Sequence, residues 1–463
     1  MDMSGQTLIT ELRNLIGPAA VLDAADTASR QAGIWRSDRL QAAALVRPRS
    51  TEEVAAVMRW CHQNGVSVVP QGGLTGLVHA ADAGPHQVIL SLERMRTIES
   101  INPQQRIATV QAGVALQSLQ EAVEGHQLMF PLDLGARGSA TLGGIAATNA
   151  GGNRVIRYGM MRDMVLGLEV VLADGTVITA LNPLLKNNTG YDLKQLFIGS
   201  EGTLGIITRL VVRLREQALT HAMAFVGLDS FAHVSQFLRH MDRSLGGTLS
   251  AFEVMWQDFY TLVTSPPAPG KPPIPQDYPF YVLVESQGAD PELDPARFER
   301  CLASAWEAGL LTDAVIAKSE ADCQAFWALR DDVGQVFNGG AAIIFDISLP
   351  IAEMEQYTQG LAASLAEQLE QHRLWIFGHV GDGNLHLSVQ LPPEDCERLR
   401  PVVEQAVYQP LAPFRGSVSA EHGIGLEKKP YLGISRSATE LDLMRTLKQA
   451  LDPQGILNPG KIL

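Results

Sequence analysis

Pro70-Gln71-Gly72-Gly73-Leu74-Thr75-Gly76 is the stretch that best indicates the fold of this chain. It follows the apolar run Val66 to Val69, which we predict to be a buried strand, and a helix that a Ser50/Glu53 capping box begins. Glycines let backbone N–H groups approach phosphate oxygens without an intervening Cβ. The stretch has neither the GxxxxGK[ST] spacing of a P-loop nor the GxGxxG of a Rossmann unit. Taken alone, it is equally consistent with a phosphate-binding loop and a structural turn.

Two more glycine-rich segments follow in the N-terminal half. Gly199-Ser-Glu-Gly-Thr-Leu-Gly205 leads into an apolar strand, and residues 138–152 add polar side chains among their glycines, namely Ser139, Thr141, Thr148 and Asn149. So much glycine is unfavourable in chain entropy unless the backbone wraps a large planar or phosphate-bearing ligand. A membrane-helix packing face is the rival interpretation, and the flanking Arg137 and Arg154 argue against it. Three such loops favour a dinucleotide cofactor.

Two short segments nearer the C-terminus gather side chains of the metal-ligand type. They are His379-Val-Gly-Asp-Gly-Asn-Leu-His386 and Ser419-Ala-Glu421-His422-Gly-Ile-Gly425. A borderline divalent metal that does chemistry needs imidazoles, a carboxylate and an open position. His379, His386 and Glu421 can supply that set, which leaves His422 beside the metal as a base. Zinc is the first expectation, with manganese or iron as alternatives; two unrelated loops with surface histidines are the competing interpretation.

Composition excludes several classes of protein. The net charge of −14, from 36 Lys+Arg against 50 Asp+Glu, argues against a nucleic-acid partner and against an anionic membrane surface. No strongly apolar run of about 20 residues predicts a transmembrane helix. The four cysteines form no CxxC pair, and Met1 to Ser4 shows no start of a secretory signal. We therefore expect a cytoplasmic protein, which at 463 residues should have roughly two to four domains.

Several motifs in a fixed order resemble the vanillyl-alcohol oxidase/p-cresol methylhydroxylase flavoprotein superfamily. The closer resemblance is to its FAD-dependent D-2-hydroxy-acid dehydrogenase branch, which includes D-lactate and D-2-hydroxyglutarate dehydrogenases and the flavin subunit of glycolate oxidase. The resemblance spans nearly the whole chain and rests on these segments: Leu45 to Val54, Pro70 to Gly76, Lys186 to Leu193, Gly199 to Ile206, Gly378 to His386 and Asn458 to Lys461.

The resemblance implies an α+β fold in three parts. Residues 1–217 should form a two-lobed FAD-binding domain of the vanillyl-alcohol oxidase type. Residues 218–415 should form an α+β cap with an antiparallel sheet, in line with the alternation of apolar strands and helical stretches over residues 221–400. Residues 416–463 should pack back on the FAD domain. The active site is expected between cap and flavin.

The resemblance also assigns the cofactor residues. The pyrophosphate should lie on Gln71, Gly72, Gly73, Leu74, Thr75, Gly76 and Leu77. The flavin and its ribityl chain should be lined by Pro131, Leu132, Asp133, Ser139, Thr141, Gly144, Thr148 and Asn149. The adenosine half should meet Glu201, Gly202, Ile206 and Ile207, with Asn458 returning near the isoalloxazine. Relatives that tether FAD covalently usually have a histidine inside the first loop, where this chain has Leu74 and Thr75. We therefore expect non-covalent FAD, with His79 as the nearest alternative tether.

The implied chemistry is oxidation of a D-2-hydroxy acid to the 2-oxo acid, with hydride transfer to flavin N5. A metal on His379, His386 and Glu421 would acidify the substrate hydroxyl, and His422 would accept its proton. Arg330 matches the family's carboxylate-binding arginine, a role that suits the guanidinium fork. An ion pair with a nearby aspartate on a helix surface is the alternative interpretation of Arg330.

Three departures from the D-2-hydroxyglutarate pattern bear on the substrate. Gly334, Ile344 and Ser388 stand where that pattern has a threonine, a lysine and an asparagine. A second substrate carboxylate would lose polar partners there, and burying it unpaired is unfavourable. We therefore favour D-lactate or a similar acid with a short or apolar tail. D-2-hydroxyglutarate or D-malate, or the role of a glycolate oxidase-type flavin subunit, remain the alternatives.

Electrons are expected to leave to an electron-transfer flavoprotein, a cytochrome or a quinone, because no nicotinamide-binding motif is visible. A flavin oxidase that uses oxygen directly is the second enzyme hypothesis. A flavin-holding subunit without turnover of its own is the third. A homodimer is left open by the sequence.

Overall fold

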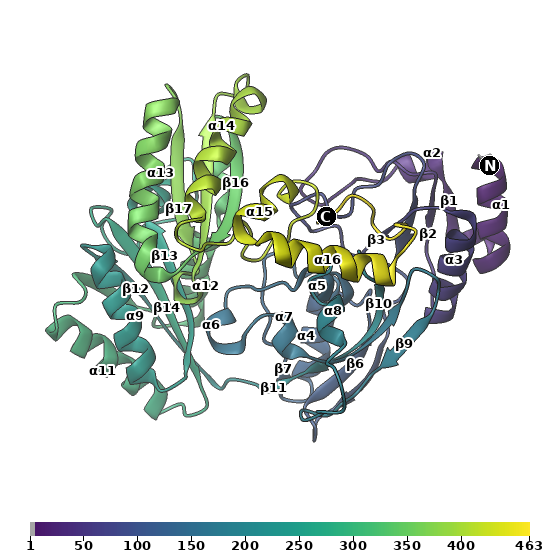
Figure 1. Cartoon of the computed structure of the whole chain (residues 1–463). Coiled ribbons are helices and arrows are strands. Elements are labelled where there is room, and N and C mark those ends of the chain that lie inside the picture. Colours follow the sequence, from purple (N-terminus) through teal and green to yellow (C-terminus); the bar gives the residue numbers. More distant parts are fainter. Residues whose placement is uncertain (1–4) are drawn as a thin grey trace. The chain divides into compact units, whose positions relative to one another are not determined.

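The computed structural model describes residues 5–463 and divides the chain into two compact units (Figure 1). Unit 1 holds the chain up to Gly152, Gly159–Gln217 and Glu421–Leu463; unit 2 holds Asn153–Tyr158 and Ala218–Ala420. Residues 1–4, on which the expected absence of a secretory signal rests, lie outside the described part. The chain leaves unit 1 after residue 217 and returns at residue 421, so residues 416–420 group with unit 2. The expected division into residues 1–217, 218–415 and 416–463 stays a prediction.

Unit 1 contains two main sheets. A four-stranded sheet has the order β1-β2-β4-β3, in which β4 is parallel to β2 and β3. A five-stranded antiparallel sheet has the order β5-β6-β10-β8-β9. The strands are β1 Val21–Asp23, β2 Ala44–Val46, β3 Val68–Gln71, β4 Val88–Ser91, β5 Ile98–Asn102, β6 Ile107–Gln111, β8 Val165–Val171, β9 Val177–Ala180 and β10 Ile206–Arg213, with a small pair of β7 Leu128–Met129 and β11 Arg215–Glu216.

Helices of unit 1 connect and cover these strands. They are α1 Gly5–Ile16, α2 Ala24–Ala28, α3 Thr51–Asn64, α4 Leu116–Glu124, α5 Leu142–Thr148, α7 Met161–Met164, α8 Lys194–Phe197, α15 Leu432–Ser435 and α16 Ala438–Leu451. The Ser50 side chain accepts a hydrogen bond from the Glu53 N–H, which caps α3, and Gly65 ends that helix in the left-handed conformation. The chain then enters β3, and the first glycine-rich loop begins at the end of that strand.

Unit 2 is built on one seven-stranded sheet with the order β15-β12-β14-β13-β17-β18-β16, antiparallel throughout. Its strands are β12 Thr220–Leu228, β13 Leu249–Trp256, β14 Phe280–Gly288, β15 Asp313–Ile316, β16 Ala341–Ser348, β17 Arg373–Gly378 and β18 Asn384–Leu391. Strand β18 is buried along its whole length, and β13 and β14 are buried except at their ends, as expected for a sheet that helices cover on both faces.

Two sets of helices cover the faces of this sheet. On one face, Phe326 of α12 (Glu320–Asp331) packs on Phe225, and Phe259 of α10 (Gln257–Thr264) stacks on Phe377 of β17. The other face is covered by α9 Phe231–Leu245, α11 Leu293–Glu307, α13 Met354–Gln368 and α14 Cys396–Tyr408 (Figure 1). The α12 helix ends at the site described below, because Arg330 lies in its last turn.

A short segment that follows the second glycine-rich loop is part of unit 2. It contains α6 Val155–Tyr158, and Arg154 just before it forms an ion pair with Glu285 of β14, with Nε 2.9 Å from Oε1. The Glu285 side chain is 1% exposed and also accepts hydrogen bonds from Ser250 Oγ and Trp327 Nε1. Although burial alone would raise the pKa of Glu285, Arg154 and these donors hold it below its usual value.

Removing this buried carboxylate is expected to destabilise the protein strongly. Glu285→Gln should lower the free energy of unfolding by about 3–5 kcal/mol, because Arg154 would remain largely buried without its counter-charge. Urea denaturation followed by tryptophan fluorescence measures the change. Glu397→Gln, which removes an exposed partner of Arg400 in the same unit, is the control and should change stability little. Equal losses in the two variants would show that Glu285 contributes no more than a surface charge.

Candidate active site

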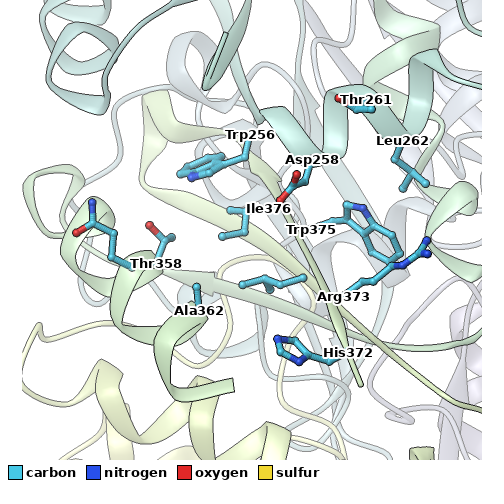
Figure 2. Close-up of a pocket in the computed structure, with 12 residues that line it drawn as sticks. Trp256, Asp258, Thr261, Leu262, Thr358, Ala362, His372, Arg373, Trp375 and Ile376 are labelled. Carbon is cyan, nitrogen blue, oxygen red and sulfur yellow. The ribbon is translucent and has the colours of Figure 1, made fainter. Parts of the chain in front are cut away.

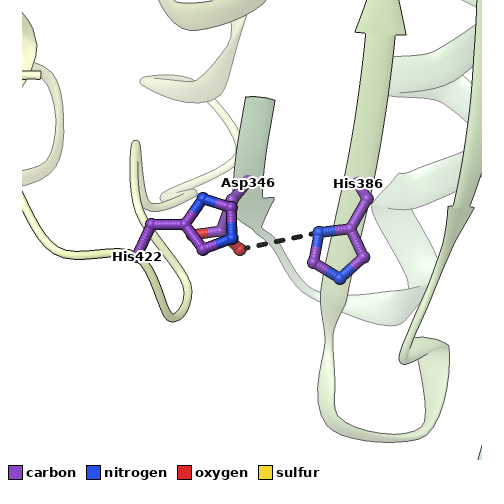
Figure 3. A group of neighbouring side chains, drawn as sticks. All are labelled: Asp346, His386 and His422. Carbon is purple, nitrogen blue, oxygen red and sulfur yellow. Dashed lines mark ion pairs between the residues drawn. The ribbon is translucent and has the colours of Figure 1, made fainter. Parts of the chain in front are cut away.

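Strand register in unit 2 places Asp346, His386 and Phe377 in one row across β16, β18 and β17. His386 therefore lies within a strand. The surrounding glycines had instead suggested a loop. Its Nδ1 is 4.0 Å from Asp346 Oδ1 (Figure 3). Asn384 Nδ2 donates to Asp346 Oδ1 at 2.9 Å. The sheet thus holds His386, one of the predicted ligands, beside the completely buried carboxylate of Asp346.

His379 follows directly after β17 and is also buried. Its Nδ1 lies 2.6 Å from Glu253 Oε1, and its Nε2 lies 3.1 Å from Arg330 Nη2. Arginine can only donate, so Nε2 must accept and the ring proton lies on Nδ1, facing Glu253. The imidazole is therefore neutral with its lone pair on Nε2. That is the protonation state in which histidine binds a metal.

Arg330 is buried at the end of α12, and its main partner is distant in sequence. Its Nε donates to Glu253 Oε2 at 2.8 Å, and Asp331 Oδ1 is further away at 3.7 Å. The alternative interpretation, an ion pair with a nearby aspartate on a helix surface, holds only in part, because the pair with Asp331 is present but Arg330 is buried. Burial tends to raise the pKa of Glu253, but His379 and Arg330 outweigh it and lower that pKa to about 2. Glu253 is thus ionised between two predicted site residues.

Glu421 and His422 come one and two residues after Ala420, which is fixed on unit 2. Asp346 Oδ2 accepts hydrogen bonds from the Ala420 N–H at 3.1 Å and from Ser419 Oγ at 3.3 Å. Ligand-type atoms of His379, His386 and Glu421 lie within 4.8 Å of one another, and so do those of Asp346, His386 and His422. The two sets share His386, and Figure 3 shows the second of them.

The first glycine loop of unit 1 packs tightly on the second. A Cβ on Gly73 would lie 1.8 Å from the Ser139 carbonyl oxygen, so only glycine allows this approach. Gly72 faces Thr141 and Gly144 in the same way. Elsewhere in the first loop, Gln71 is buried and its side chain donates a hydrogen bond to the Ala81 carbonyl. Leu74 has a φ of 55°, and Leu77 is exposed. Gly76 has open space where a Cβ would point.

The remaining predicted flavin-lining residues lie around α5 of unit 1. Thr148 Oγ1 donates to the Gly144 carbonyl at 3.1 Å, and Asn149 Oδ1 accepts from the Arg162 N–H at 2.9 Å. A Cβ on Gly152 would lie 2.0 Å from the Asp133 carbonyl oxygen, which brings the segment Pro131, Leu132 and Asp133 beside the second loop. Of these flavin-lining residues, Ser139, Thr141 and Gly144 are the ones that the structure places against the first loop.

The side chain of Glu201 is engaged within unit 1, and its predicted contact with adenosine stays a prediction. Its carboxylate accepts hydrogen bonds from the N–H groups of Ile424 at 2.7 Å and Gly425 at 2.8 Å. Burial raises the pKa of Glu201, and these two donors oppose the rise. Glu201 therefore holds the loop that follows Glu421 and His422. Its neighbour Gly202 lies against Pro70, and Ile206 and Ile207 are buried in β10.

Two buried polar atoms at the predicted cofactor loops lack a partner within residues 5–463. They are Thr141 Oγ1 and Asn458 Oδ1. Asn458 Nδ2 donates to the carbonyls of Ala80 and Glu201, so its amide is oriented and its oxygen is presented. Buried polar atoms are rarely left unpaired, which fits a polar ligand at this place. Together with the contact between Gly73 and Ser139, these atoms fit the predicted dinucleotide.

Sequence analysis missed Glu253 and did not use Asp346. Glu253 stands inside the apolar run Ala251-Phe252-Glu253-Val254-Met255, where a lone carboxylate is unfavourable unless it is paired. That isolated charge within an apolar run was the available signal. Its partners, 126 and 77 residues away, were not visible in the sequence.

A separate cavity of about 670 Å³ lies elsewhere in unit 2. Its lining comes from α10, α13, β17 and the end of β13, and includes Trp256, Asp258, His372 and Trp375 (Figure 2). The predicted site residues do not line it. This cavity is therefore distinct from the cluster of His379, His386 and Glu421.

Comparisons with known proteins agree with these observations. Residues 220–462 match the family of FAD linked oxidases, C-terminal domain, and residues 42–181 match the FAD binding domain family. A mitochondrial D-2-hydroxyglutarate dehydrogenase of Bos taurus is 43% identical over 92% of this chain and 78% of its own length. The D-2-hydroxyglutarate dehydrogenase of Stutzerimonas stutzeri is 36% identical over 99% of both chains. A putative mitochondrial D-lactate dehydrogenase of Schizosaccharomyces pombe is 37% identical over 90% of this chain and 81% of its own.

The fold comparison points the same way. The structure of p-cresol methylhydroxylase with substrate bound superimposes with a TM-score of 0.77, at 16% identity, over 99% of this chain and 96% of its own. The predicted α+β fold with a flavin-binding domain of this type is confirmed.

Each helix in the described part of the chain is too short or too polar to span a bilayer.

The predicted cytoplasmic location is wrong. The relatives from Bos taurus, Rattus norvegicus and Schizosaccharomyces pombe are all named as mitochondrial proteins. All four cysteines are free and buried, and burial raises the pKa of the Cys61 thiol to about 12. Such inert thiols fit any reducing compartment, so they carried no information about which one.

The matching families and relatives cover both units, and the two glycine loops and the histidine row lie inside the matched residues. This chain belongs to the D-2-hydroxy-acid dehydrogenase branch of the FAD-dependent vanillyl-alcohol oxidase/p-cresol methylhydroxylase superfamily.

Proposed function

We propose that this FAD-dependent oxidoreductase converts a D-2-hydroxy acid to the 2-oxo acid with the help of a divalent metal on His379, His386 and Glu421. The observation that carries the proposal is the approach of their ligand atoms to within 4.8 Å of one another. The alternative set with Asp346 is less suited, because both oxygens of that carboxylate already accept hydrogen bonds. Zinc is our first choice, and manganese or iron the alternatives.

The protonation state of His379 supports a ligand role. Its neutral ring presents the Nε2 lone pair, while Nδ1 donates to Glu253. The Nη2 group of Arg330 occupies that lone pair in this structure, so the arginine contact must give way when a metal binds there. A guanidinium released in this way can turn to a carboxylate while its Nε stays on Glu253.

We assign the remaining roles from the same geometry. Arg330 binds the substrate carboxylate, and His422 accepts the hydroxyl proton. A metal held by His379, His386 and Glu421 would lower the pKa of that hydroxyl, and FAD, when bound, would supply the hydride acceptor. Glu201 holds the segment after His422 through the N–H groups of Ile424 and Gly425, which keeps the base in a fixed loop. We propose that FAD is held without a covalent bond, because Leu74 and Thr75 stand in the first loop where relatives that tether FAD usually have a histidine.

The neighbours of His386 favour a substrate with a short or apolar tail. Ser388 lies two residues further along β18, between Ile344 of β16 and Trp375 of β17 in the sheet register. Ser388 Oγ is buried without a partner among the described residues. This trio of neutral side chains offers one hydroxyl and no cation to a distal carboxylate. D-Lactate is our first candidate, and D-2-hydroxyglutarate, the named substrate of several relatives, is the alternative.

A substrate screen tests this proposal. With the purified flavoprotein and an artificial electron acceptor, kcat/KM for D-lactate should exceed that for D-2-hydroxyglutarate by about 10-fold, and L-acids should be inactive. Ile344→Lys adds a cation and should raise kcat/KM for D-2-hydroxyglutarate relative to D-lactate, by about 1.5–3 kcal/mol if the charged hydrogen bond forms. Ile343→Val on the same strand, whose side chain points to the opposite face, is the control. A preference for D-2-hydroxyglutarate in the unmodified enzyme would overturn the tail assignment alone.

We propose an electron-transfer flavoprotein, a cytochrome or a quinone as the electron acceptor. Anaerobic bleaching of the flavin by substrate, followed by slow reoxidation in air, is the expected behaviour. Fast reoxidation would instead identify an oxidase. An isolated chain that no 2-hydroxy acid bleaches would be a flavin-holding subunit.

A further inference from the structure

Glu253 connects two side chains that the proposed reaction uses. It stands in the middle of β13, its side chain is 1% exposed, and each of its two oxygens has one partner. Oε1 lies 2.6 Å from His379 Nδ1, and Oε2 accepts from Arg330 Nε at 2.8 Å. The guanidinium also lies over the Phe377 ring, 5.1 Å from its centroid. The carboxylate therefore fixes one predicted metal ligand and one predicted substrate-binding group at the same time.

We propose that Glu253 is the positioning residue that sets metal affinity through His379 and substrate-carboxylate binding through Arg330. This inference rests on the proposed function. By accepting a hydrogen bond from the Nδ1–H group, Glu253 leaves the lone pair on Nε2 and makes that nitrogen a stronger ligand. Glu253 holds only the Nε group of Arg330. The Nη groups therefore stay able to contact either His379 or a bound substrate carboxylate. The residue itself touches neither the metal nor the reacting atoms.

Stability alone does not explain this group. Taking a carboxylate, a guanidinium and an imidazole out of water is unfavourable, and apolar residues of similar volume often serve a fold equally well. Glu285 on the neighbouring strand β14 provides the comparison within the same sheet. It is 1% exposed and paired with Arg154, like Glu253 with Arg330, but its partners include neither histidine of the proposed metal site. Glu285→Gln should therefore match Glu253→Gln in lost stability and differ from it in metal binding.

The experiment measures Zn²⁺ affinity on the full-length flavoprotein, by competition with a chromophoric chelator, together with metal content. Glu253→Gln should bind Zn²⁺ about 10- to 100-fold more weakly than the unmodified protein. Glu253→Asp keeps the charge but has a shorter reach, and it should recover part of the affinity. Glu285→Gln should bind Zn²⁺ like the unmodified protein, although it is destabilised. His386→Asn, which removes a proposed ligand, should bind least.

A second readout separates positioning from general damage. The KM for the 2-hydroxy acid should rise in Glu253→Gln even at saturating Zn²⁺, because Arg330 loses the partner that holds its Nε. Zn²⁺ affinity in Glu253→Gln equal to that in Glu285→Gln, with His386→Asn clearly weaker, would overturn the inference and leave the proposed function intact. Equal affinity in His386→Asn and the unmodified protein would overturn the proposed metal site itself. If Glu253→Gln does not fold, Glu253→Asp decides between these outcomes, since undiminished affinity there contradicts the inference.

Discussion

Turnover of D-2-hydroxy acids should fall by at least about 1,000-fold in His386→Asn, while FAD content stays unchanged. Such a fall corresponds to about 4 kcal/mol of lost transition-state stabilisation, the scale expected when a metal no longer polarises the substrate hydroxyl. The histidine lies inside β18 with its neighbours held on both sides by the sheet, so the variant should fold. Steady-state kinetics and the flavin absorbance spectrum measure the two effects.

The matched control for this prediction is His372→Asn. His372 lies in the same unit and lines the separate cavity, so it should retain full activity and full FAD. If His386→Asn keeps activity within a few-fold of the unmodified enzyme, this histidine is structural and the ligand set is wrong. A loss of FAD in His386→Asn would likewise show that the histidine acts through folding and not through the substrate.

Gly73→Ala should weaken FAD binding by about 10- to 100-fold or more. The new Cβ would lie 1.8 Å from the Ser139 carbonyl oxygen and 3.1 Å from Ala140 Cα, so the two glycine loops would have to separate. Overpacking of a well-packed contact typically costs about 1–3 kcal/mol, and a contact between two backbone segments has little room to relax. The FAD dissociation constant, measured by the recovery of flavin fluorescence on dilution, gives the effect.

Gly76→Ala provides the control within the same loop. A Cβ there would meet no atom within 4 Å, so FAD affinity should change little. Equal weakening in both variants would mean that loop flexibility, and not the approach to Ser139, governs cofactor binding. Circular dichroism of each variant distinguishes a local change in the loop from loss of unit 1.

Local sequence signals predicted the local structure well. Ser50 begins α3, as its capping box with Glu53 indicates, and Gly65 ends the helix in the left-handed conformation. These features depend on residues within a few positions of one another. The glycine loops were recognised for the same reason, because a close backbone approach requires glycine wherever its partner lies.

Long-range pairing was not predictable in the same way. Strands β13 and β18 were missed, although His386 lies on β18 and Glu253 on β13. Their place follows from the sheet order β13-β17-β18-β16, which no local pattern carries. The contacts of Glu201 show the same limit, because its carboxylate binds backbone N–H groups more than 220 residues away.

The most direct test is anaerobic titration of the purified flavoprotein with D-lactate before and after complete metal removal by a chelator, followed by addition of Zn²⁺. We expect substrate to bleach the flavin, the chelator to abolish bleaching without releasing FAD, and Zn²⁺ to restore it. Undiminished bleaching by a protein that metal analysis shows to be metal-free would contradict the proposal that His379, His386 and Glu421 act through a bound ion.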